Sequence, residues 1–138
     1  MDSNTLIFEG NYLNGKRNGK GTEYFVGAGV LCEGDFVKGL QWDGKGYSYI
    51  GKLVFKVVKG KGHVKKLSVY GKVYFEGEYV NGKKHGKGKE YNYQGKLIFE
   101  GEFLNGKKNG KGKEYYLNGN TKFEGIYYWD MKNGRGRD

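Results

Sequence analysis

The sequence predicts an all-β protein: an elongated single-layer antiparallel meander of repeated β-hairpins, with no substantial helix. The 138 residues include 27 Gly, 13 Tyr, 8 Phe and no Pro. Glycine weakens helices, whereas aromatic residues favour pleated strands. Apolar and polar residues also alternate along short segments, which indicates strands with one packed face. Finally, blocks of similar sequence recur at a regular interval, as in repeat architectures.

The repeated block opens on Phe-Glu-Gly or a variant of it. Residues 75–98 read FEGEYVNGKKHGKGKEYNYQGKLI, and residues 99–122 read FEGEFLNGKKNGKGKEYYLNGNTK. Alignment on this opening divides 1–138, which we expect to be one repeat array, into units with spacings of 24, 23, 20, 24 and 24 residues. The units begin at Phe8, Cys32, Phe55, Phe75, Phe99 and Phe123.

Each unit reads as one hairpin. In the fifth unit the segment 99–104 alternates between aromatic or glycine residues and glutamates, as expected of a strand. Asn105-Gly106 then predicts a tight turn, because Asn and Gly tolerate positive φ. We call this the first turn of the unit. A second strand follows over about 110–117. Asn118-Gly119 then predicts the second turn, which leads into the next unit. We expect the glycines of 110–112 to lie where an aromatic ring covers the backbone.

Three units, 8–31, 75–98 and 99–122, follow the pattern closely, and we call them the clean units. The others differ. The second has an extra residue between Gly39 and Gly44, and the sixth, 123–138, is incomplete. The third, 55–74, is degenerate, and we expect it to lack the first turn. The segment 41–70 departs from the repeat pattern. Either its sequence has diverged because nothing constrains it, or it forms a site that the other units lack.

The pattern F-E-G-E-Y-x-N-G-K-x-x-G-x-G resembles the MORN (membrane occupation and recognition nexus) repeat, over about 8–136. The resemblance implies a twisted ribbon of hairpins that acts as a scaffold, attaching proteins to membranes or cytoskeletal assemblies, sometimes as a dimer. The clean units have 24 residues where a typical MORN unit has 23. The extra residue lies after the second turn, near 120–122, and predicts a longer connection or a bulge. The tryptophan common at the fifth position is replaced by Tyr12, Phe36, Tyr79, Phe103 or Tyr127.

Aromatic residues on the packed face form the first candidate site. A single-layer ribbon has no second sheet to cover them, so they either cover one another as the core or leave a groove for a partner helix or peptide. The residues predicted for this partner-binding face are Phe8, Tyr12, Phe36, Phe75, Tyr79, Phe99, Phe103, Phe123 and Tyr127.

Basic residues beside the first turn of each unit form the second candidate site. Stacked along one edge, they are suited to anionic lipid headgroups, although solvated turns that keep the chain soluble explain them equally well. These residues are Lys16, Arg17, Lys83, Lys84, Lys107 and Lys108.

Glutamates on the opposite face recur in every unit, which is unlike a single catalytic carboxylate pair. The rows are Glu9, Glu33, Glu76, Glu100, Glu124 and Asp35, Glu78, Glu102. We expect them to pair across strands with Lys89, Lys113 or Lys122. We expect His63 and His85 to lie on the surface and Cys32 to pack as a small apolar residue. The sequence thus predicts no catalytic residue, metal site or cofactor.

The net charge of +10 favours acidic partners. No apolar run is long enough to span a membrane, and the first residues lack signal-peptide features. We therefore expect a soluble, cytoplasmic, non-enzymatic scaffold, peripheral to membrane or cytoskeleton. It would bind a protein partner, with anionic lipid as a second partner and a homodimer formed through a terminal edge strand. The alternatives are single-stranded nucleic acid binding, which we consider unfavourable, and a regulatory fragment of a lipid-kinase-like or methyltransferase-like protein.

Overall fold

A computed structural model describes residues 6–25, 30–48, 50–68 and 72–132. This part of the chain contains twelve β-strands and no helix, so the predicted all-β fold is confirmed. It also contains no helix long and apolar enough to cross a membrane.

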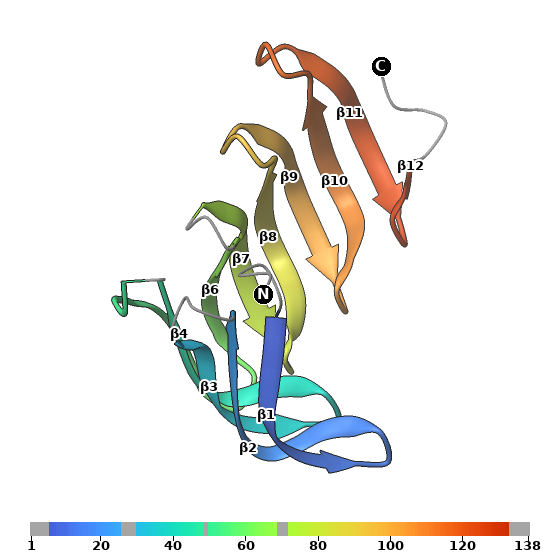
Figure 1. Cartoon of the computed structure of the whole chain (residues 1–138). Helices are drawn as coiled ribbons and strands as arrows, with labels where there is room; N and C mark the ends of the chain where they lie inside the picture. The colour runs from blue at the N-terminus through green and yellow to red at the C-terminus, as the bar shows by residue number, and fades with distance from the viewer. Residues whose placement is uncertain (1–5, 26–29, 49, 69–71, 133–138) are drawn as a thin grey trace.

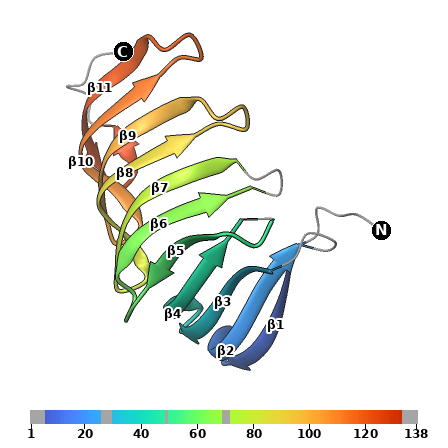
Figure 2. The ribbon, with the colours of Figure 1, turned by 90° about the vertical axis from the view of Figure 1, so that its left-hand side faces the viewer.

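The strands form two antiparallel sheets in strict chain order (Figures 1 and 2). The five-stranded sheet contains β1 (Leu6–Leu13), β2 (Lys16–Phe25), β3 (Val30–Val37), β4 (Leu40–Tyr47) and β5 (Leu53–Val57). The seven-stranded sheet contains β6 (Gly62–Leu67), β7 (Val73–Val80), β8 (Lys83–Tyr91), β9 (Leu97–Leu104), β10 (Lys107–Tyr115), β11 (Thr121–Tyr128) and β12 (Met131–Lys132).

The first turn of each unit has the geometry that Asn-Gly favours. Asn105 and Gly106 have φ values of 51° and 86°, as a two-residue hairpin turn with positive φ at both positions requires. The turns also bond to one another: the Gly106 N–H donates to the carbonyl of Lys84 at 3.0 Å, and the Gly82 N–H to that of Gly60 at 2.9 Å. Consecutive first turns are therefore stacked along one edge of the ribbon.

The predicted loss of the first turn in the third unit is wrong. Val58 and Lys61 form an antiparallel bridge around Lys59 and Gly60, whose φ values of 53° and 75° match those of the other first turns. The unit instead has shorter strands, because β5 and β6 have five and six residues where β9 and β10 have eight and nine.

The two sheets meet at this short hairpin. Val64 pairs with Gly77 as Gly88 pairs with Gly101 in the next unit, and Val57 likewise occupies a glycine position. Both valines are buried and belong to one apolar cluster. Because their side chains fill the space where glycine backbones approach in the clean units, β5 and β6 share only the bridge at their turn.

The paired glycines of the clean units have two different roles. A Cβ on Gly112 would lie 2.7 Å from the Tyr127 ring and 2.8 Å from the Phe99 ring, so the predicted ring over backbone is confirmed there. Gly110 does not lie under a ring: it has a φ of 111°, and a Cβ would meet the carboxylate of Glu102. It lies where the register between β9 and β10 shifts, which is a bulge position that favours glycine.

A second bulge recurs just before the opening residue of each unit. Glu114 pairs with Phe123, but the next residue, Tyr115, pairs with Thr121, which leaves Lys122 unpaired. The same shift precedes Phe99 and Phe75. The bulge predicted near 120–122 is thus confirmed, and the irregularity belongs to the repeat.

Gly112→Ala tests the ring contact. The new methyl group would overlap two rings in the packed core, so we expect a loss of about 1–3 kcal/mol in the free energy of unfolding. Chemical denaturation measures it, with Lys111→Ala as the control on the same strand but the opposite face. Equal stability of the two variants would contradict the contact.

Candidate functional site

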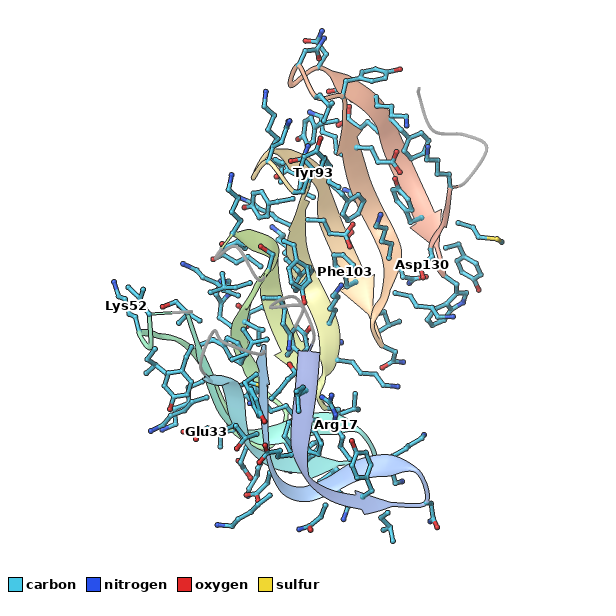
Figure 3. All side chains as sticks on the ribbon, viewed as in Figure 1. Arg17, Glu33, Lys52, Tyr93, Phe103 and Asp130 are labelled. Carbon is cyan, nitrogen blue, oxygen red and sulfur yellow. The ribbon has the colours of Figure 1, made fainter. Side chains whose placement is uncertain are left out.

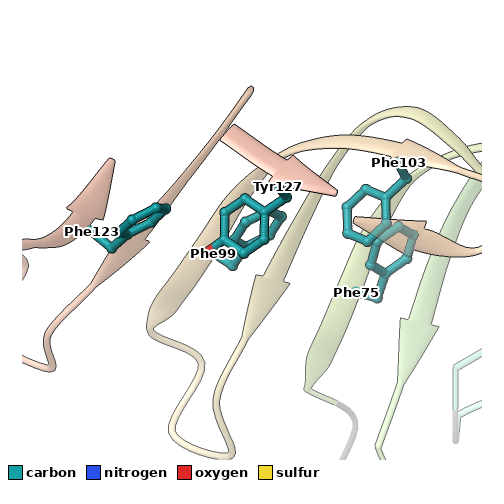
Figure 4. Packing of buried hydrophobic residues seen from close by; sticks show 5 residues of the cluster. All are labelled: Phe75, Phe99, Phe103, Phe123 and Tyr127. Carbon is teal, nitrogen blue, oxygen red and sulfur yellow. The ribbon is translucent and has the colours of Figure 1, made fainter. Parts of the chain in front are cut away.

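The aromatic residues of the seven-stranded sheet form a continuous zigzag of edge-to-face contacts (Figure 4). All the ring pairs in this zigzag have interplanar angles between 69° and 89°, the arrangement that the ring quadrupole favours. The centroid distances are 6.0 Å for Tyr79–Phe75, 5.5 Å for Phe75–Phe103, 5.7 Å for Phe103–Phe99, 5.2 Å for Phe99–Tyr127 and 5.5 Å for Tyr127–Phe123.

A cation covers the opening ring of each clean unit. The Lys84 Nζ lies 4.2 Å from the centroid of Phe75, and the Lys108 Nζ lies 4.1 Å from that of Phe99. In the first unit the Arg17 guanidinium lies 4.3 Å from Phe8. These cation–π contacts close the aromatic face in the absence of a second layer.

A carboxylate accompanies these cations on the same face. Glu90 lies 3.2 Å from the Nζ of Lys108 and 3.9 Å from that of Lys84, and Glu23 lies 2.5 Å from Arg17. Burial, the largest influence, lowers the pKa of Lys84, against an opposing influence from Glu90. The cations are thus partly desolvated and belong to the packing of this face.

The predicted aromatic face consists of two sets of ring contacts, one on each sheet, and it is largely closed. Of the described rings, Phe75, Phe99, Phe103, Phe123, Tyr127 and Phe36 are at most 4% exposed, whereas Tyr12 is 59% exposed. The alternative in which the rings cover one another therefore describes most of the face. Binding of a partner by these rings stays a prediction.

The predicted basic edge divides into two sets, because neighbouring residues of a strand point to opposite faces. Lys16, Lys83 and Lys107 are exposed beside the first turns. Arg17, Lys84 and Lys108 lie instead over the aromatic rings. The edge does not end with the clean units, since Lys38 and Lys59 are exposed in the first turns of the second and third units. The sequence patterns had not singled out these two.

The opposite face of the seven-stranded sheet carries a groove of about 950 Å³. We call it the charged groove. Its floor is the glycine backbone of four strands, and its walls are the acidic and basic residues on either side. Its lining is Gly77, Gly88, Gly101, Gly112, Glu76, Glu78, Glu100, Glu102, Glu124, Lys87, Lys89, Lys111, Lys113 and His63.

The expected cross-strand ion pairs do not form in this groove. Lys89 stands opposite both Glu76 and Glu100 in the register, and Lys113 stands opposite Glu100 and Glu124. Yet the ion pairs found in the described part of the chain include none of the groove lysines, and none with Lys122. Glu76, Glu78, Glu100 and Glu102 accept hydrogen bonds from other donors.

His63 bridges two of these glutamates at one end of the groove. Its Nε2 lies 2.8 Å from Glu76 and its Nδ1 lies 2.8 Å from Glu78. Both hydrogen bonds, that to Glu76 first, raise the pKa of His63 above its ordinary value of 6.5. The ring is exposed, as predicted, but no sequence pattern indicated its role at the end of the groove.

Cys32 and His85 lie in different surroundings. Cys32 is 5% exposed and packs as the predicted apolar residue; burial, with the nearby Glu23, raises its pKa to about 12. His85 is exposed at its turn. Among the described residues no group of three or more His, Cys, Asp or Glu is placed to hold a metal ion.

The fold and its surfaces define a class of protein: a single-layer array of β-hairpins with one closed face and one open face. Within this class, the family model described as the MORN repeat matches residues 8–27, 75–96 and 99–121. These three segments are therefore MORN repeats, as the resemblance indicated, and they lie in the clean units. The search of curated proteins finds no match.

Lys108→Ser tests the cation cover. The variant loses the contact with Phe99 and the ion pair with Glu90, so we expect the free energy of unfolding to fall by about 1–2 kcal/mol. Lys107→Ser removes the same charge from the exposed side of the turn and should change stability by less than about 0.5 kcal/mol. Denaturant titration that finds equal losses would contradict the assignment.

The titration of His63 tests the His63 clamp, which is our name for its two hydrogen bonds to Glu76 and Glu78. We expect an NMR-measured pKa above 6.5 and a fall toward that value in Glu76→Gln and Glu78→Gln, with Glu124→Gln at the far end as control. Because the pKa is raised on folding, the stability gained is full below the unfolded pKa and is lost as pH rises through the folded pKa. A pKa insensitive to Glu76 and Glu78 would refute the clamp.

Proposed function

We propose that the chain is a non-enzymatic scaffold that docks on anionic membrane surfaces through its first-turn edge. MORN repeats are generally binding and scaffold modules, and the edge adds the chemistry. The observation that carries the proposal is one exposed lysine at each stacked first turn from the first to the fifth unit: Lys16, Lys38, Lys59, Lys83 and Lys107.

Exposed apolar residues beside these lysines favour a lipid surface over simple solvation. Leu13 is 58% exposed, Val37 39% and Val58 53%, and each directly precedes a first turn. An edge that combines apolar side chains with lysines can place the former at the headgroup boundary while the latter meet anionic headgroups. Each lysine near such a surface contributes about 1 kcal/mol.

Stacking of the turns supports simultaneous contact. Successive first turns are two strands apart, about 9.6 Å, and the hydrogen bonds between them hold this spacing. Since the distance is close to the Debye length of about 8–10 Å at physiological salt, the lysines act as separate contacts whose energies add.

The alternatives have less support in the geometry. Stacking of nucleic acid bases needs open rings, but Phe75 and Phe99 are each 1% exposed under their cations. A protein partner on the aromatic face would first have to displace Lys84 and Lys108. A homodimer through the C-terminal edge depends on residues 133–138, which lie outside the described residues.

Co-sedimentation with vesicles tests the edge. We expect binding to phosphatidylcholine vesicles that contain phosphatidylserine and none to phosphatidylcholine alone. The combined variant Lys16→Asn, Lys38→Asn, Lys59→Asn should lose about 3 kcal/mol of binding free energy. Asparagine suits the positive φ of positions 38 and 59, so the turns are kept.

The matched control removes the same charge from the opposite edge, where Lys52 and Tyr93 project from second turns (Figure 3). Lys52→Asn, Lys72→Asn, Lys122→Asn should bind as the unaltered protein does. If only this control variant lost binding, the membrane contact would lie on the second-turn edge, which contradicts the proposal. Absence of binding to both kinds of vesicle would also refute it.

A further inference from the structure

The first turn of the sixth unit differs in composition from the others. Trp129 and Asp130 take the place of the Asn-Gly pair of the clean units and have φ values of 50° and 70°. Tyr128 and Met131 flank them and pair with each other across the turn. We call these four residues the tryptophan turn. Because Met131 stands where Lys107 stands in the fifth unit, this turn has an apolar residue in place of the exposed lysine.

Hydrogen bonds hold the tryptophan turn on the same edge as the other first turns (Figure 1). The Asp130 N–H donates to the carbonyl of Lys108 at 2.8 Å, which is the kind of bond that stacks the preceding first turns. One carboxylate oxygen of Asp130 accepts a hydrogen bond from the Lys108 N–H at 2.7 Å. The Trp129 N–H donates to the side chain of Asn109 at 3.3 Å. The turn is therefore fixed to β10 by three hydrogen bonds.

Apolar side chains of the tryptophan turn are open to solvent. Tyr128 and Met131 are 64% and 69% exposed, and Trp129 is 41% exposed. The rings of Trp129 and Tyr128 meet edge to face at a centroid distance of 6.0 Å. Ile126 lies two residues before Tyr128, on the same face of β11, and is also exposed. Together these side chains form an apolar patch that the packing of the ribbon leaves open.

The backbone conformation of Trp129 suits a smaller residue. Bulky side chains are rare at positive φ, whereas Asn and Gly adopt it readily, and Asn105 has the equivalent position in the fifth unit. Residues held in such sparsely populated conformations occur preferentially at functional sites. The indole is therefore not the side chain that the turn itself favours.

The chemistry of the patch matches the boundary between lipid headgroups and acyl chains. Trp and Tyr combine an apolar ring with one polar group, and they are enriched at this boundary in membrane proteins. The patch also continues the edge on which exposed lysines, such as Lys83 and Lys107, are suited to anionic headgroups. Lysine contacts weaken with salt, whereas apolar burial does not depend on charge. Stable attachment to a membrane requires more than one such signal.

We propose that the tryptophan turn is the apolar anchor of the first-turn edge, and that Trp129, Tyr128 and Met131 enter the headgroup boundary of a membrane containing anionic lipid. This inference rests on the proposed function and assigns the deepest contact to one end of the edge. The lysines of the preceding turns meet headgroups, each beside a single apolar residue, while the sixth turn inserts three apolar side chains.

Tryptophan fluorescence tests the insertion, because the chain has two tryptophans, Trp42 and Trp129. In Trp42→Phe, Trp129 is the only emitter. With vesicles of phosphatidylcholine and phosphatidylserine, we expect its emission to shift to shorter wavelength and to be quenched by lipids brominated on their acyl chains. The matched variant Trp129→Asn leaves Trp42 as the emitter. Since the Trp42 ring packs against Gly60, we expect no quenching there.

The affinity of Trp129→Asn for the same vesicles tests the weight of the anchor. Asparagine is the residue of the clean units at this position, so the variant should keep its turn and its stability. We expect its affinity to fall about tenfold, because a large apolar side chain is no longer buried in the membrane. The matched control, Tyr93→Asn, removes a more exposed ring from the opposite edge (Figure 3) and should retain the affinity.

Two outcomes would overturn the anchor and leave the proposed function intact. One is vesicle binding in which the Trp129 emission neither shifts nor is quenched, and the other is equal affinity of Trp129→Asn and Tyr93→Asn. Absence of binding to vesicles with phosphatidylserine would refute both proposals. Chemical denaturation checks that the variants are folded. If Trp129→Asn were destabilised, the quenching measured in Trp42→Phe would decide.

Discussion

Everything in this structure depends on how a single layer of strands buries its aromatic rings. A sheet without a covering layer leaves one face of each ring open to water, which would forfeit much of the hydrophobic stabilisation. Here the lower side of each ring rests on glycine backbone, its edge meets the next ring, and a lysine or arginine covers its upper side. The repeat carries all three contacts, so each added unit extends the same packing.

That arrangement explains why the two faces differ in chemical character. Two lysines follow the first turn of each of the fourth and fifth units. The second of them, Lys84 or Lys108, covers an aromatic ring, and the first projects at the edge. On the other face the backbone at these same glycines forms the floor of the charged groove, between charged walls. Packing on the aromatic face requires glycine at these positions. Val57 and Val64 show the consequence of its absence, because the sheet divides where they replace glycine.

Much of the fold follows from sequence because it depends on local rules. Alternation, Asn-Gly turns and the repeat period predicted the hairpins and the strand order without tertiary information, and comparison with the length of a typical MORN unit predicted the bulge. The third unit was misjudged because Lys59-Gly60 forms the same turn without the expected asparagine. The roles of Lys84 and Lys83 could be separated only by strand parity, which two adjacent lysines obscure. The His63 clamp depends on side-chain reach across β6 and β7, which no local pattern encodes.

The most direct test of the cation cover over the aromatic rings is the proton chemical shift of the lysine ε-methylene groups. Protons held over the face of an aromatic ring are shielded by its ring current. We expect the ε-methylene signals of Lys84 and Lys108 to lie clearly upfield of those of Lys83 and Lys107, which project into solvent. Four lysines with the same unshifted signals would contradict the account, because the rings would then have to be buried by something other than these cations.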